Sequence, residues 1–236
     1  MPGETFKIAV RLHLEVPVTR AQCNIAGCQH IPVWEKGAHA HHAQRKVTRR
    51  HTAVKDEIQL FFRALRTSGQ SDYEVIPEVT MEELGFTKKP DAPVQAGAVA
   101  DIALRHATTR HVFVTDVTIR YPDPMDPQTS EQPLAAAEQG VKQKYDRYVR
   151  NYNIAKDDVK PLVFETYGGY AKCTFDFLKS MVQTIAKGEA KLIAKLMRAL
   201  RERIAIALMT HHAYVIMWMN QREQTTVVET VEALGG

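Results

Sequence analysis

Two aspartates lie inside apolar segments that otherwise have the composition of buried strands. Asp101 is in VADIALR and Asp116 is in HVFVTDVTI, with a basic, turn-like stretch between the segments. A carboxylate that faces a core costs several kcal/mol unless it is paired, neutralised or bound to a cation. A hairpin would bring the two acids together, and a divalent cation between them would relieve their repulsion. Such an ion polarises a phosphodiester and activates water, so the pattern favours metal-dependent hydrolysis. In the alternative interpretation, both acids point outward at strand ends.

A basic residue for the same chemistry comes from the helix predicted from about Leu134 to Asn153. Lys144 lies three residues after Val141 and four before Tyr148, on the apolar side that should face a sheet, whereas Lys142 falls on the charged side. An ammonium group near the aspartates could orient water or stabilise developing negative charge. The alternative is a lysine at the edge of the apolar stripe with its charged end in water.

A cluster of cysteines and histidines near the N-terminus has the ligand types of a zinc site. Tetrahedral zinc takes four nitrogen or sulfur ligands, and one short loop can supply them. The preferred set is Cys23, Cys28, His39 and His42. His30 and His41 are the alternates. The competing interpretation is a basic, histidine-rich loop with two free thiols that contacts phosphate.

The pattern of apolar residues predicts the elements that must position these side chains. A helix begins near Thr52, and a strand interrupted by Pro77 follows at 73–79, which suits either an edge strand or a bulged strand. The expected order is then two hairpin strands, the Lys144 helix, a strand at 160–167, a helix at 174–184 and a long helix at 189–222. A helix between the third and fourth strands favours a parallel pair, so we expect a mixed α/β sheet flanked by helices. We also expect a break near the His211–His212 pair and a weakly ordered tail from Glu223.

Composition and charge limit the classes to which this protein can belong. The chain has 236 residues, a net charge of +4 and three cysteines, and no run is long and apolar enough to span a membrane. The beginning of the sequence lacks the order of a signal peptide, so we expect an intracellular protein without a disulfide framework. Basic residues concentrate at 36–55 and 187–203, which suits a polyanionic partner. Three regions are predicted: 1–48, 49–185 and 186–236.

In order and spacing, the motifs resemble those of a known family. A helix is followed by Asp101, then by Asp116 in VTDV, then by a helix with KQKY and a strand PLVFETYG. This pattern resembles the PD-(D/E)XK nuclease superfamily, and more narrowly the restriction-like endonuclease domain of non-LTR retrotransposon polyproteins. That domain follows a zinc knuckle and opens with an arginine-histidine pair, and CNIAGC, AHAHH and RRHTAVKDEI stand here in the same order. The resemblance covers about residues 7–210.

The resemblance implies roles for particular residues. Asp101 and Asp116 would bind Mg²⁺ or Mn²⁺, and Lys144 would orient water or stabilise the transition state. Arg49, Arg50 and His51 would lie near the DNA backbone, and the knuckle would hold Zn²⁺. The implied fold is a restriction-endonuclease-like αβββαβ core with an N-terminal zinc-knuckle-like segment and C-terminal helices. Glu78 and Glu165 are further acids near strand ends that could reach the metal.

The sequence departs from the family pattern at three places. The usual E-x-K motif is Asp116-Val117-Thr118 here, so the lysine must come from the following helix, as it does in the retrotransposon subgroup. The PD dipeptide is Ala100-Asp101, which keeps the carboxylate. The knuckle ends in histidine where the family usually has cysteine.

The function expected from the sequence is that of a magnesium-dependent endonuclease. It would nick one strand of target DNA so that a reverse transcriptase, in the same polyprotein or separate, primes from the new 3′-OH on an RNA template. This function implies a nuclear location and no membrane partner. The alternative is a nucleic-acid-binding module that keeps the fold and has weakened catalysis.

Overall fold

The computed structural model describes residues 44–93, 97–121 and 132–234, without the side chains of residues 44–48, 212 and 215–234. The predicted zinc ligands Cys23, Cys28, His39 and His42 lie outside these ranges. The described residues fall into two compact units, one formed by His51–Ala205 and the other by the residues before and after it. The fold and the candidate site described below belong to the His51–Ala205 unit.

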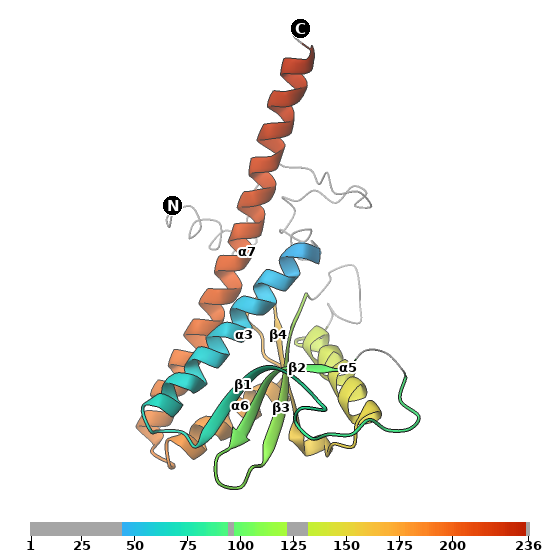
Figure 1. The fold of residues 1–236 in the computed structure, drawn as a ribbon. Coiled ribbons are helices and arrows are strands. Elements are labelled where there is room, and N and C mark those ends of the chain that lie inside the picture. Colours follow the sequence, from blue (N-terminus) through green and yellow to red (C-terminus); the bar gives the residue numbers. More distant parts are fainter. Residues whose placement is uncertain (1–43, 94–96, 122–131, 235–236) are drawn as a thin grey trace. The chain divides into compact units, whose positions relative to one another are not determined.

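The His51–Ala205 unit contains a four-stranded mixed sheet of order β1-β2-β3-β4 (Figure 1). The strands are β1 (Tyr73–Thr80), β2 (Val99–His106), β3 (Val112–Arg120) and β4 (Val159–Glu165). Neighbouring strands are antiparallel for β1–β2 and β2–β3 and parallel for β3–β4. The hairpin and the parallel last pair were predicted from the sequence, and the structure confirms them. The proline-bearing strand, predicted to be an edge strand or a bulged strand, lies at the edge.

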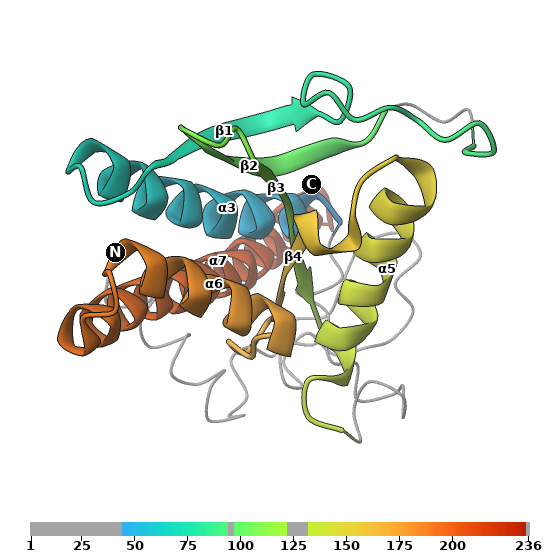
Figure 2. The same cartoon turned by 90° about the horizontal axis from the view of Figure 1, so that it is seen from below.

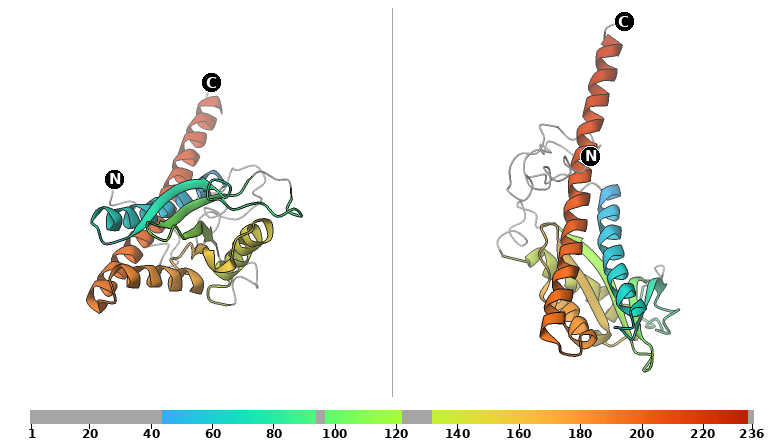
Figure 3. Two further views of the ribbon diagram at one scale, coloured as in Figure 1. Left: turned by 60° about the horizontal axis from the view of Figure 1, so that its bottom comes forward. Right: turned by 90° about the vertical axis from the view of Figure 1, so that its left-hand side faces the viewer.

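Helices cover both faces of this twisted sheet. They are α3 (Gln44–Thr67), α5 (Ala135–Asn151), α6 (Lys172–Ile185) and α7 (Ala190–Leu234), and a short 3-10 helix, η1 (Lys156–Asp158), precedes β4. Figures 2 and 3 show α5 on one side of the sheet, with α6 and the part of α3 within this unit on the other. The predicted α/β class with a mixed, helix-flanked sheet is therefore observed.

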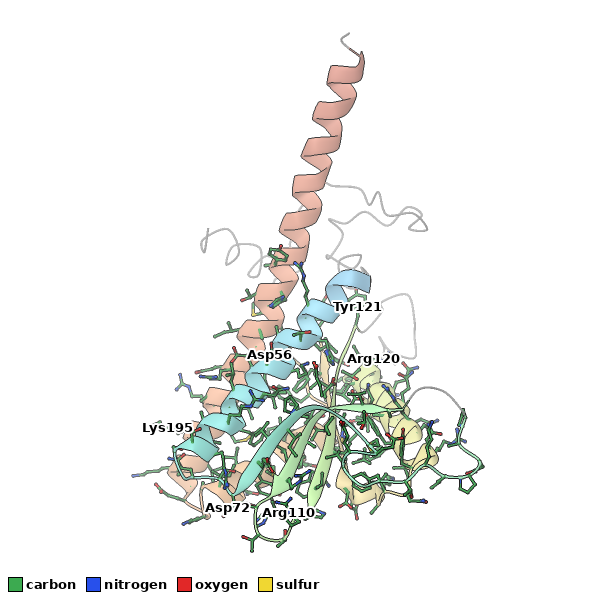
Figure 4. The ribbon with its side chains drawn as sticks, in the orientation of Figure 1. Asp56, Asp72, Arg110, Arg120, Tyr121 and Lys195 are labelled. Carbon is green, nitrogen blue, oxygen red and sulfur yellow. The ribbon has the colours of Figure 1, made fainter. Side chains whose placement is uncertain are left out.

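Close packing fixes α5 against the sheet at a glycine. A Cβ atom added to Gly140 would lie 2.9 Å from Val163 Cγ1 of β4 and 3.2 Å from the Arg120 side chain of β3. Figure 4 labels Arg120 at the end of β3, next to α5. Tyr148, on the same helix, and Tyr152, immediately after its end, are almost completely buried in a core formed with β1, β2 and β3. The helix that carries Lys144 is thus held against β3 and β4, and its Tyr148 hydroxyl reaches Val99 of β2.

The helix α7 differs from the sequence expectation. It continues from Ala190 to Leu234 without a break near His211–His212, and helix replaces the weakly ordered tail expected from Glu223. Residues 190–234 contain no proline or glycine, so nothing in this stretch removes a backbone donor or favours a positive φ. Within the described residues, no helix is both long and apolar enough to cross a membrane.

Candidate metal centre

Asp101 lies where the regular pairing of β2 ends. The β2–β3 pairs run from Arg105 and Val112 to Ile102 and Thr115, and Asp101 is the next residue along β2. Its carboxylate Oδ2 accepts a hydrogen bond from the Val117 amide at 2.7 Å. A side-chain oxygen therefore occupies the place that a main-chain carbonyl would take in a continued ladder. This explains how an aspartate is accommodated inside an apolar strand.

Asp116 is the next residue beyond the same pairs on β3, and it is buried with only 4% of its surface exposed. Lys144 Nζ lies 2.6 Å from Oδ1, and Arg147 contributes a longer contact of 3.8 Å to Oδ2. The Tyr148 hydroxyl lies 2.7 Å from Oδ2 and 2.9 Å from the Val99 carbonyl oxygen. Because one hydroxyl carries one hydrogen, Tyr148 can donate to only one of these oxygens at a time.

His51, from α3, completes the cluster. Its Nε2 lies 2.9 Å from Asp101 Oδ2, and one ligand atom each from His51, Asp101 and Asp116 lie within 4.8 Å of one another. Four separate elements, α3, β2, β3 and α5, therefore bring two carboxylates, an imidazole and an ammonium group together. The sequence-predicted trio of Asp101, Asp116 and Lys144 is assembled at one place in the fold.

The two carboxyls have opposite electrostatic environments. Burial is the strongest influence on Asp101 and acts to raise its pKa, but the hydrogen bond and charge of His51, with the Val117 amide, bring that pKa below its usual value. Burial raises the pKa of Asp116, and the neighbouring Asp101 charge adds to this, against the opposing effect of Lys144. The hydrogen bond with Asp101 raises the pKa of His51. Asp101 is thus held ionised, while Asp116 takes up a proton more readily.

The donor set fits a divalent cation. Carboxylate oxygens are preferred by Mg²⁺ and Mn²⁺, and an imidazole is acceptable to Mn²⁺. A cation bound between Asp101 and Asp116 would also remove the repulsion that raises the pKa of Asp116. Lys144 and Tyr148 already contact the Asp116 oxygens, so a metal would share or replace these contacts.

The other predicted residues have contacts of their own. Arg49 and Arg50 belong to the other compact unit, where Arg49 is exposed and donates to the Tyr214 hydroxyl at 3.4 Å, while Arg50 is buried. Glu78 pairs with Lys55. Glu165 is buried and accepts a hydrogen bond from the Ala137 amide.

Register separates Glu165 from the cluster. Asp116 pairs with Pro161, and Glu165 is four residues further along β4. That offset corresponds to about 13 Å along a strand. Glu165 therefore does not join the two aspartates in this structure.

Several residues of the cluster were assigned other roles, or none, from the sequence. Tyr148 was placed on the apolar side of its helix, which its burial confirms, but its hydroxyl also contacts Asp116. The place of His51 near the DNA backbone stays a prediction, and in the structure its imidazole contacts Asp101. Lys55 and Gln59 were not singled out, although His51, Lys55 and Gln59 recur every four residues beside the apolar face of α3. A polar stripe of that period within a buried helix is the signal that could have identified them.

Comparison of the chain with protein-family models, curated proteins and solved structures gives no match.

Proposed function

We propose that this protein is a metal-dependent DNA endonuclease of the PD-(D/E)XK class, with its metal held by Asp101 and Asp116. The observation that carries the proposal is the convergence of Asp101, Asp116 and Lys144, each supplied by a different element. Two carboxylates can hold a divalent cation that polarises a phosphodiester, and an ammonium group beside it can stabilise the developing negative charge. The αβββαβ order with a parallel last pair of strands agrees with that class.

Each residue of the cluster has a chemical task in this proposal. The bound cation would polarise the phosphodiester and lower the pKa of a water molecule. His51 keeps Asp101 ionised and therefore able to bind a cation. Lys144 has three donor hydrogens, so an ammonium that donates one to Asp116 has others for a phosphate oxygen or for the attacking water. Tyr148 restricts the rotation of the Asp116 carboxylate.

The other parts of the chain would position the substrate. In this proposal the Cys/His segment binds zinc and, together with the basic residues at 36–55 and 187–203, contacts the DNA backbone with little base reading. A nick made in this way would leave a 3′-OH for a reverse transcriptase acting in the same polyprotein or separately, with an RNA template.

A plasmid-nicking assay tests the proposal. The protein should convert supercoiled DNA to the open circle with Mg²⁺ or Mn²⁺, and chelation should stop the reaction. Asp116→Asn should abolish nicking while DNA retardation in a gel persists, because the isosteric amide keeps a group for Tyr148 but weakens the metal site. Asp146→Asn, an exposed acid on α5, is the matched control and should nick like the unmodified protein. Equal nicking by Asp116→Asn would overturn the assignment.

One observation favours a second function. Lys144 contacts Oδ1 of Asp116 and the Tyr148 hydroxyl lies against Oδ2, so both oxygens have polar partners without a metal. This arrangement suits a nucleic-acid-binding module that has kept the fold and lost the chemistry. DNA retardation without nicking in either metal would support this second function, and absence of both activities would contradict the two proposals together.

A further inference from the structure

Strand pairing is interrupted on both sides of Asp101. On the β1 side, Pro77 pairs with Ile102 and Val79 pairs with Ala100, but Glu78 and Asp101, which lie between them, are not paired. On the β3 side, the pairs stop at Ile102. Asp101 is therefore a strand residue without regular ladder partners on either side, and its position depends on other contacts.

Three residues of α3 surround this interruption, one turn apart. His51 contacts the Asp101 carboxylate, and Gln59 Nε2 donates to the Asp101 main-chain oxygen at 3.4 Å. Between them, Lys55 Nζ forms an ion pair with Glu78 Oε1, directly across the interruption from Asp101. The His51 and Gln59 side chains therefore contact Asp101 at the place where neither neighbouring strand pairs with it.

The Lys55–Glu78 pair would be energetically unfavourable if stability were its only role. Lys55 is buried, with 6% of its surface exposed, and the removal of an ammonium group from water is energetically unfavourable. Glu78 has φ of 45°, a left-handed conformation that is strained for a non-glycine residue. Its side chain is 66% exposed, so the pair gains little from a dry environment. An apolar residue at 55 and a straight β1 would avoid both costs.

We propose that Lys55 is a positioning residue, which holds Glu78 and the turned backbone of β1 so that the Asp101 carboxylate is fixed for a divalent cation. The inference rests on the proposed function in one respect, because it takes Asp101 to be a metal ligand. Lys55 acts through Glu78 and the strand, and it contacts neither metal nor substrate in this account. Residues that orient a ligand in this way commonly change metal affinity by about 10- to 100-fold when they are removed.

Two readouts test the proposal in the full chain. The first is Mn²⁺ affinity, followed by the loss of the free-ion electron paramagnetic resonance signal. Lys55→Met should weaken Mn²⁺ binding about tenfold, and Glu78→Gln should weaken it in the same direction. Because the two residues act as one unit, the double variant should be no weaker than Lys55→Met alone. Glu57→Gln, which removes the exposed pair of Arg203 with α3, should leave the affinity unchanged.

The second readout needs no metal. The Val117 amide donates to Asp101 Oδ2, so its hydrogen exchange measured by NMR reports directly on the Asp101 carboxylate. Exchange at Val117 should rise at least about tenfold in Lys55→Met and in Glu78→Gln, with the amides of β4 unchanged. If Lys55→Met does not fold, Glu78→Gln, at an exposed position, still tests the proposal.

The outcomes separate the two ideas. Unchanged Val117 exchange in both variants, or additive losses of Mn²⁺ affinity, would overturn the positioning role. A protein that binds no Mn²⁺ but shows the faster Val117 exchange would contradict the proposed function and leave Lys55 as the residue that positions Asp101.

Discussion

At the scale of single residues, α5 supplies the groups that face Asp116. Lys144 and Tyr148 are four residues apart, so they lie on the same side of the helix and reach the two oxygens of one carboxylate. Lys142 lies on the exposed side of the same helix. Lys144 and Lys142 therefore lie on different sides of α5, and substitutions at the two positions can be compared directly.

Removal of the Lys144 ammonium should separate catalysis from folding. We expect Lys144→Met to reduce nicking by at least about 100-fold, because no other ammonium contacts Asp116 among the described residues. DNA retardation should persist. Lys142→Met should nick at the unmodified rate, and a comparable loss in both variants would show that general charge, not position, supports the reaction.

The Tyr148 hydroxyl should contribute to stability as well as to the site. Tyr148→Phe leaves the buried Asp116 carboxyl and the Val99 carbonyl with one donor fewer. We expect the free energy of unfolding in urea to fall by about 1–2 kcal/mol. Tyr145→Phe, on the less buried side of α5, is the comparison and should change it by less than about 0.5 kcal/mol. A smaller loss for Tyr148→Phe than for Tyr145→Phe would contradict this account of the hydroxyl.

Sequence reasoning identified part of this cluster. Asp101 and Asp116 were identifiable because charged residues are costly in apolar strands, and Lys144 because of its phase relative to the stripe on α5. Tyr148 has the same phase as ordinary core residues, so nothing in its spacing indicates a polar contact. Lys55 could be found only through the polar stripe that it forms with His51 and Gln59 on α3, and that spacing does not indicate which strand residues the stripe contacts.

At the scale of elements, α5 is positioned by its contact with β3 and β4. Gly140 permits this contact, since an added Cβ would lie 2.9 Å from Val163 Cγ1. Helix propensity alone favours alanine over glycine by about 1 kcal/mol. The close contact with Val163 opposes this preference for alanine. It should dominate, because Gly140 and Val163 are both buried where α5 meets the sheet.

Gly140→Ala should therefore destabilise the protein by about 1–3 kcal/mol. Urea unfolding measures this change. Gln143→Ala, an exposed position on the same helix, should be neutral or slightly stabilising and controls for propensity. A stabilised Gly140→Ala variant would mean that α5 packs less closely than the structure indicates.

The second compact unit offers a prediction about pH. Burial lowers the pKa of His211, and the charges of Arg49 and Arg50 lower it further. The unfolded chain then binds a proton at this histidine before the folded chain does, so the free energy of unfolding should fall as the pH drops through about 6.5. His211→Gln should show a smaller loss of stability between pH 7.5 and pH 5.5 in urea unfolding. An identical pH dependence in both proteins would contradict this prediction.

Most elements were predictable because their signals are local. Hydrophobic period, the Gly168-Gly169 turn and proline positions predict the helices and strands, and the length of the β3–β4 connection predicts a parallel pair. The continuity of α7 was not predicted. A histidine pair carries no breaking signal comparable with proline or glycine, so the expected break had little physical basis.

At the scale of the whole molecule, charge is unevenly distributed along the chain. The segment 187–203 has six basic and two acidic residues, an excess equal to the net charge of +4 of the complete chain. Such a segment suits the phosphate backbone of DNA, which releases counterions when basic residues bind it.

The predicted zinc site can be tested on the complete chain. Protein purified without added zinc should contain about one equivalent of zinc by metal analysis, because four ligands of the preferred types stand within one short segment. Cys23→Ser combined with Cys28→Ser should remove it. Less than about half an equivalent in the unmodified protein would contradict the zinc prediction.

The central claim is that Asp101 and Asp116 together hold one divalent cation. Titration with Mn²⁺, followed by electron paramagnetic resonance in the unmodified protein and in Asp116→Asn, measures this directly. We predict about one Mn²⁺ bound per chain, displaced by Mg²⁺, with an affinity that falls at least about tenfold in Asp116→Asn. Equal Mn²⁺ binding by the two proteins, or no binding by either at millimolar metal, would contradict it.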